Sequence, residues 1–167
     1  MRIDDWPLER IMRLPDWCFG QRWPVGLYAT KTGAGSAWDI SEIALPEVSV
    51  LWEFTFWPLE IMAQTTNFRL ALGQQLPVAT AQMDQLEPLL AGVGIQGPTP
   101  RQIIGQGYAA PAIRMLRKPI ESGGKKVILE LTTGGAAAQD LQVILVFSSI
   151  PREVPDWLFS AQVINLP

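Results

Sequence analysis

The feature that most constrains this chain is a set of short runs in which apolar and polar residues alternate. In residues 48–57 every even-numbered position is apolar, and three of the odd-numbered positions are polar. A period of two residues is typical of a β-strand with one buried face. The alternation places Trp52 on the apolar face and Trp57 on the opposite one. Pro58 predicts the end of the strand, because proline cannot donate a hydrogen bond to a neighbouring strand.

Similar runs recur along the chain. Residues 67–72 alternate in the same way, with Phe68, Leu70 and Leu72 on one face, and Gly73 ends the run. Residues 103–116 predict one or two strands, interrupted by a proline. Residues 127–132 and 141–147 flank a loop rich in glycine and alanine, and together they predict a hairpin. The second of these strands is apolar on both faces, which favours a central position in a sheet.

Little helix is predicted. Residues 5–14 suit a short helix with Pro7 in its first turn, and residues 80–91 suit another that Pro88 shortens. Residues 18–44 are rich in glycine and proline, and indicate loops with one short strand near residues 25–30. Many short strands with turn signals predict a mainly β protein, a single-domain β-sandwich or jelly roll with one or two short helices and an extended N-terminal arm.

The expected division of the chain places its boundary before the first clear strand. We expect residues 1–46 to form the arm and a loop-rich segment packed on the domain, and residues 47–167 to form the sandwich core.

Several residue types that carry enzyme chemistry are missing. The chain has no histidine and one cysteine, Cys18, which excludes a Ser-His-Asp triad, an internal disulfide and a thiolate metal cluster. We expect Cys18 to be a small buried hydrophobe. No run approaches the roughly 20 apolar residues that span a bilayer, and two acids near the N-terminus do not suit a signal peptide. We therefore expect neither a membrane partner nor a metal, and no catalysis.

Two apparent motifs remain. Residues 92–97 have the glycine spacing of a dinucleotide-binding loop, but a Pro-Thr-Pro segment follows and prevents the helix that such a loop needs. We therefore expect no cofactor. The acid pairs Glu42 with Glu47 and Glu53 with Glu60 leave open a carboxylate enzyme such as a glycosidase, which needs two carboxyls across a cleft.

Tryptophan is unusually frequent. There are seven tryptophans, whereas charged residues make up only 17% of the chain, below the average of about 25%. Four tryptophans lie in loop-like or terminal segments, and tryptophan is enriched at protein interfaces. An echo links residues 15–19 (PDWCF) to residues 155–159 (PDWLF). It indicates either a repeated capped turn or two Trp–Phe anchors for neighbouring subunits.

Positive charge gathers in one segment. Residues 101–126 hold six basic side chains and one acid, within a chain of net charge −3. One aromatic residue, Tyr108, lies among them, so a stacking platform for nucleic acid is not indicated. The charges suit an acidic neighbouring subunit or a solvated loop. The residues that we expect at protein interfaces are Trp6, Trp17, Trp23, Trp157, Phe159, Arg114 and Arg117.

In these features the chain resembles small β-rich virion proteins of bacteriophages, namely decoration (cement) proteins and minor capsid or tail subunits. The resemblance rests on the length, the Trp-Pro pairs at Trp6 and Trp23, the lack of a signal peptide, and the strand-loop-strand pattern of residues 127–147. It implies a non-enzymatic, homo-oligomeric subunit that contacts other virion proteins through its arms after synthesis in the host cytoplasm. It implies no site residues.

Two other interpretations of the tryptophans stay open. The terminal segments could wrap their own domain, or exposed indoles could serve as platforms for sugars in a carbohydrate-binding β-sandwich module.

Overall fold

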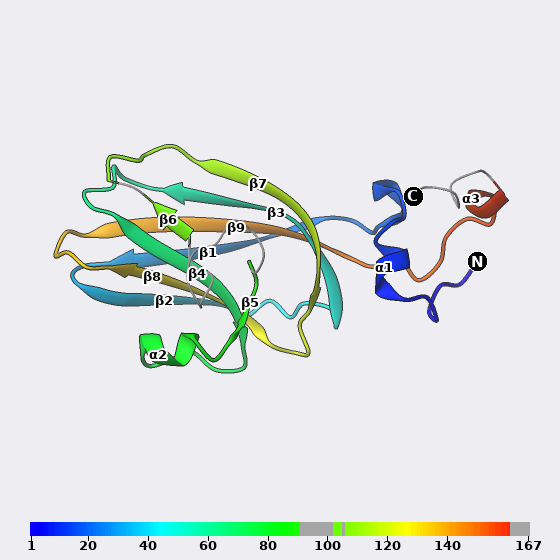
Figure 1. Ribbon diagram of the computed structural model, residues 1–167, viewed down its shortest axis with the longest axis horizontal. Coiled ribbons are helices and arrows are strands. Elements are labelled where there is room, and N and C mark those ends of the chain that lie inside the picture. Colours follow the sequence, from blue (N-terminus) through cyan, green and yellow to red (C-terminus); the bar gives the residue numbers. More distant parts are fainter. Residues whose placement is uncertain (91–101, 105, 161–167) are drawn as a thin grey trace.

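The computed structural model describes residues 1–90, 102–104 and 106–160 (Figure 1). The run 92–97 lies outside the described residues. The strands are β1 (Trp23–Lys31), β2 (Gly35–Ser41), β3 (Val48–Pro58), β4 (Thr66–Gly73), β5 (Glu87–Pro88), β6 (Gln102–Ile104), β7 (Ala112–Glu121), β8 (Lys126–Thr133) and β9 (Gln139–Ser149). The helical segments are α1 (Leu8–Ile11), the 3-10 turn η1 (Asp16–Cys18), α2 (Thr80–Met83) and α3 (Trp157–Ser160). None of the described helices has the length and apolar character needed to cross a membrane.

The strands form two antiparallel sheets. Sheet I has the order β1-β9-β3-β7, and sheet II has the order β2-β8-β4-β5, with β6 paired to β4. Strands β1 to β4 alternate between the sheets, and β7 to β9 do so again, which is the strand order of a jelly roll. The prediction of a mainly β sandwich or jelly roll with few short helices is confirmed.

The main hydrophobic core lies between the sheets. On β4, Phe68, Leu70 and Leu72 join this core, whereas Arg69 and Ala71 lie on the other side of the strand. The predicted alternation of this strand is therefore confirmed. It holds because each inward position meets apolar residues of the facing sheet, so that a polar residue there would lose its hydration without gaining a partner.

The predicted hairpin of residues 127–147 is wrong. β8 pairs with β2 and β4 in sheet II, while β9 pairs with β1 and β3 in sheet I. The connecting loop, residues 134–138, crosses from one sheet to the other. Alternation identifies a strand with a buried face, but it does not identify the strand's partner. The predicted central position of the second strand is confirmed, since β9 lies between two neighbours.

The segment expected to be mostly loops contains two full strands. β1 pairs with β9 from Trp23 to Lys31, and β2 pairs with β8 from Gly35 to Ser41. Residues 23–31 and 35–41 thus belong to the sheets, and we call residues 1–22, which precede the first strand, the arm. The alternation of β1 was hidden because Pro24 and Gly26 occupy outward positions, where an edge strand of a sheet tolerates them.

A β-bulge changes the face on which Trp52 lies. The register of β3 against both neighbours shifts between Leu51 and Glu53. An extra residue at a bulge reverses the expected alternation beyond it. Leu51 and Phe54 therefore enter the main core, while Trp52 packs on the outer side of sheet I. The predicted burial of Trp52 is confirmed at 2% exposure, but the predicted face is wrong.

The two ends of the chain pack together over Trp52. The Met1 amine donates a 2.7 Å hydrogen bond to the carbonyl of Val154, and the amide of Ile3 donates one of 3.1 Å to the carbonyl of Arg152. α1, α3 and the N-terminus gather at one end of the sandwich (Figure 1). The outer cluster that they form comprises Ile3, Ile11, Leu14, Phe19, Val50, Trp52, Val154 and Leu158.

The outer side of sheet II is covered by the α2 segment. Helix α2 spans four residues, shorter than the predicted 80–91, and the chain then forms β5 at Glu87–Pro88. Met83 packs on Ala71 and Ile128 in a small apolar cluster. Beside it, Arg69 is fully buried and forms ion pairs with Glu130 and Asp84.

Candidate protein interface

One face of the sandwich is only half covered. The arm covers the outer side of sheet I around Val50 and Trp52, and beyond the bulge the outward positions of all four strands lie open. We call this surface the open face. Its three cross-strand rows, from the covered end outwards, are Pro24, Val146, Glu53 and Met115; then Gly26, Ile144, Thr55 and Ile113; and then Tyr28, Gln142 and Trp57.

The open face is apolar and carries little charge. Ile113 and Met115 are 62% and 67% exposed, and Tyr28 and Trp57 are 46% and 45% exposed. Glu53 is the one carboxylate in these three rows, and Asp140 of β9 follows beyond the row of Gln142. Exposed apolar surfaces of this kind are typical of interaction sites, which makes the open face the candidate interface.

These residues were mostly missed by sequence reasoning. The alternation predicted Trp57 on the polar face of its strand, and Trp57 is 45% exposed there. The prediction that Trp52 lies on the opposite face is wrong, because the bulge leaves both indoles on the outer side of sheet I. The sequence did not predict that Ile113 and Met115 would be exposed on one face, because Pro111 obscured where β7 begins. Tyr28 was not predicted to be part of an outward row, because Pro24 and Gly26 obscure the alternation of β1.

The arm is held on sheet I by a charged and aromatic contact. Asp16 forms ion pairs with Arg117 (Nη1 to Oδ1, 2.9 Å) and with Arg22 (Nη2 to Oδ2, 3.4 Å). The Arg22 guanidinium lies 4.0 Å from the ring centroid of Trp52, and Phe19 meets the same ring edge-on at 5.2 Å. Cation–π and edge-to-face contacts of these lengths favour the docked arm.

Arg117 and Arg114, both expected at interfaces, differ in their surroundings. Arg117 donates a hydrogen bond to the carbonyl of Leu14 and has φ 52, so β7 bends where its side chain reaches the arm. Its contacts are thus within the chain. Arg114 is exposed on β7, opposite Phe54 of β3. An interface role for either arginine stays a prediction.

The two tryptophans of the sequence echo meet each other. Trp17 and Trp157 stack with ring centroids 5.5 Å apart and an interplanar angle of 16°. They remain 56% and 59% exposed, because each covers only one side of its partner. The Met1 amine pairs with Asp156 of the same echo at 2.8 Å. The echo therefore joins the two ends of the chain and leaves outer indole surfaces in solvent.

The other aromatic residues expected at interfaces are partly used within the chain. Trp6 is half-buried, with the Arg10 guanidinium 3.7 Å from its ring centroid. Trp23 is half-buried and stacks on Phe147 at the border of the main core. The side chain of Phe159 lies outside the described residues.

The basic segment is partly neutralised within the chain. Lys125 pairs with Glu87 at 2.9 Å, and Lys126 pairs with Glu42 at 3.4 Å. Lys118 donates a hydrogen bond to the carbonyl of Leu89. Burial lowers the pKa of Lys118, and the negative charge of Glu87 opposes this shift. These pairs favour ordinary surface charges over a basic platform.

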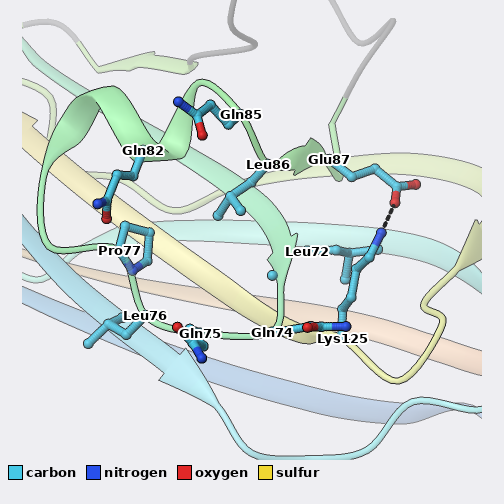
Figure 2. A pocket seen from close by; sticks show the side chains of 11 residues that line it. Leu72, Gln74, Gln75, Leu76, Pro77, Gln82, Gln85, Leu86, Glu87 and Lys125 are labelled. Atoms are coloured by element: carbon cyan, nitrogen blue, oxygen red, sulfur yellow. Dashed lines mark hydrogen bonds and ion pairs between the residues drawn. The ribbon is translucent and has the colours of Figure 1, made fainter.

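A hollow of about 590 Å³ lies between the loop after β4 and the α2 segment (Figure 2). Four glutamines surround it, and the Lys125–Glu87 ion pair lies on one side. In the described part of the chain, no group of three or more Cys, Asp or Glu side chains is placed to hold a metal ion. The polar side chains that line the hollow are therefore neutral glutamine amides and one lysine and one glutamate that pair with each other.

No protein-family model and no curated protein sequence matches this chain. It is similar to the tomato aspermy virus structure, with a TM-score of 0.43 and 13% identity over 92% of this chain and 86% of that one. It is similar to the coat protein dimer of tobacco streak virus, with a TM-score of 0.38 and 11% identity over 87% and 95% of the two chains. It is also similar to the Yersinia pseudotuberculosis-derived mitogen, with a TM-score of 0.37 and 11% identity over 81% and 92%.

Proposed function

We propose that this protein is a structural subunit of a virus particle, and more narrowly a decoration, minor capsid or tail protein of a phage. It acts through protein–protein contacts without catalysis, with itself and with other virion subunits. It is made in the host cytoplasm and ends in the virion. The observation that carries the proposal is the open face of sheet I.

The open face supports an assembly role because of its composition. Ile113 and Met115 are each more than 60% exposed on a sheet whose other end the arm already covers. Removing such side chains from water favours association, and the surplus over the entropic cost of binding appears as affinity. The fully buried centres of permanent interfaces have this apolar character. The chain's own arm is docked over Trp52 by the ion pairs of Asp16.

The terminal segments supply a second proposed contact. Trp17 and Trp157 form an exposed aromatic surface at one end of the molecule. Tryptophan desolvates a large rigid area at little entropic cost, which suits an anchor for a neighbouring subunit.

Particle fractionation tests the proposed function. The wild-type chain and an Ile113→Lys variant are produced in the cells that make the virus, and particles are separated from soluble proteins on a density gradient. The wild-type chain is expected with the particles and the variant with the soluble proteins. A Val78→Lys variant is the control, because Val78 is 83% exposed and lies outside the open face. A wild-type chain found only with the soluble proteins would contradict the proposal.

A carbohydrate-binding role is the second candidate, and one observation favours it. Tyr28, Gln142 and Trp57 form one row across three neighbouring strands. Neighbouring strands lie about 4.8 Å apart, so the backbones of Tyr28 and Trp57 lie about 10 Å apart with Gln142 between them. Two rings and a hydrogen-bonding amide suit a saccharide chain lying across the sheet. Titration with a glycan panel, followed by tryptophan fluorescence in wild-type and Trp57→Phe chains, tests this role; no response from any glycan would contradict it.

A further inference from the structure

We infer that a second copy of this chain covers the open face, in a two-fold dimer whose axis runs across the strands along the row of Thr55 and Ile113. The inference rests on the proposed function and names the partner at that face. It follows from where the polar groups of the face lie relative to this row.

Apart from the Thr55 hydroxyl in the middle row, the polar groups in the three rows of the open face separate into a carboxylate on one side of that row and side-chain donors on the other. Glu53 lies two residues before Thr55 on β3, and Trp57 lies two residues after it. Gln142 of β9 shares the row of Trp57. Among the described residues Glu53 has no ion-pair partner. A carboxylate covered without hydrogen-bond donors is costly, so whatever covers this face has to supply donors at Glu53.

A two-fold axis along the Thr55 row supplies those donors from the same sequence. The rotation places β3 against β3 of the second copy and exchanges the rows on either side of the axis, each about 7 Å from it. Glu53 then faces the indole N–H of Trp57 and the amide of Gln142 in the second copy, and the reverse contact forms as well. Such reciprocal pairing is the property of an isologous interface. The middle row brings Ile113 near its own symmetry mate.

The size of the face suits a weak dimer. Its three rows hold eleven outward positions, each covering about 4.8 Å by 6.7 Å, which gives about 350 Å² for each copy, or roughly 700 Å² in projection over two copies. The accessible surface buried is larger than this projected area, because side chains project from the sheet. Specific interfaces below about 1,200 Å² are transient. We therefore expect association that depends on concentration.

The edges of sheet I are less suited to a second copy than its face. At the β1 edge, the backbone amide of Tyr28 donates a hydrogen bond to the carboxylate of Asp39. This N–H is therefore not available to the backbone of an added strand. At the β7 edge, Arg117 has φ 52 and Pro119 lacks an N–H. Both features interrupt strand addition.

Self-association of the purified full chain is the first test. Light scattering during size-exclusion chromatography is expected to show a shift from monomer to dimer with rising concentration. Ile113→Lys is expected to raise the dimer dissociation constant by roughly tenfold or more, because two lysines then meet near the axis. Val78→Lys is the matched control and leaves the constant unchanged. An unchanged thermal transition of Ile113→Lys shows that the fold persists.

Cross-linking tests the axis itself. In a Cys18→Ala background, Thr55→Cys is expected to link to its own copy with a short bismaleimide, whereas Glu53→Cys links efficiently only when mixed with Trp57→Cys. Val78→Cys measures random collision. A chain that stays monomeric, or Thr55→Cys linking no faster than Val78→Cys, overturns the inference. If such a chain still enters particles and Ile113→Lys does not, another virion protein covers the face, and the proposed function stands without the dimer.

Discussion

The indole Nε1 of Trp52 donates a 2.7 Å hydrogen bond to Oγ of Ser148, and both residues are buried on the outer side of sheet I. The bulge in β3 turns Trp52 towards the arm, and the hydroxyl on β9 satisfies the one polar atom that this turn would bury without a partner.

Replacing Ser148 by alanine is expected to destabilise the fold by about 1–3 kcal/mol, because the buried indole N–H then loses its acceptor. Urea denaturation followed by tryptophan fluorescence measures the change. Ser149→Ala is the control, since Ser149 is only half-buried. A Ser148→Ala chain as stable as the wild type would show that water or another group replaces the hydroxyl.

The buried ion pair under α2 makes a second prediction. Arg69 and Glu130 lie directly opposite each other on β4 and β8 and are almost fully buried. Glu130→Leu removes the buried partner of Arg69 and leaves its guanidinium only the partly exposed Asp84 as an ion-pair partner, so the variant is expected to cost about 3 kcal/mol, the lower end for a broken buried pair. The double variant Arg69→Leu with Glu130→Leu is expected to lose clearly less than the sum of the single variants. Denaturation of all four chains gives this coupling, and additive losses would contradict it.

The stacked indoles at the chain ends make a third prediction. Trp17 and Trp157 are expected to show a coupling energy of about 0.5–1.5 kcal/mol in a double-mutant cycle with alanine, as stacked aromatic pairs do. Thermal denaturation of the monomeric protein at low concentration measures it. A coupling near zero, together with lost particle binding in both single variants, would mean that the two rings act only on neighbouring subunits.

Much of the sandwich could be predicted because alternation reports burial directly. β3 and β4 were found to within a residue or two, since each has one face against the core and few residues that break the period. The same signal carries no information about strand partners. β8 and β9 were therefore assigned to a hairpin, although they lie in different sheets.

The candidate site could be predicted only in part, for two physical reasons. A bulge adds one residue without leaving a mark in composition, so the face of Trp52 could not be known beforehand. The open face is assembled from four strands that are distant in sequence. Its exposed residues have the same apolar character as core residues, so only the arrangement of the sheets shows that Ile113 and Met115 lack a cover.

Cys18 provides a reporter of arm docking. It is half-buried against the outer cluster, and burial raises the pKa of its thiol, while the positive charge of Arg117 opposes this shift. The thiolate is the reactive form, so a raised pKa lowers the reactive fraction at neutral pH. We expect Cys18 to react with a thiol reagent more slowly than free cysteine at pH 7.5. The rate should still be rising at a pH where free cysteine has reached its plateau.

Loosening the arm should reverse this protection. Asp16→Ala removes the ion pairs to Arg22 and Arg117, each worth about 0.5 kcal/mol at a partly exposed site. Labelling of Cys18 in this variant is expected to be several-fold faster, and its pH profile should move towards that of free cysteine. Asp5→Ala serves as the control, because Asp5 is an exposed acid of the same arm. If both variants label at the wild-type rate, docking of the arm depends on the apolar packing around Trp52 and not on Asp16.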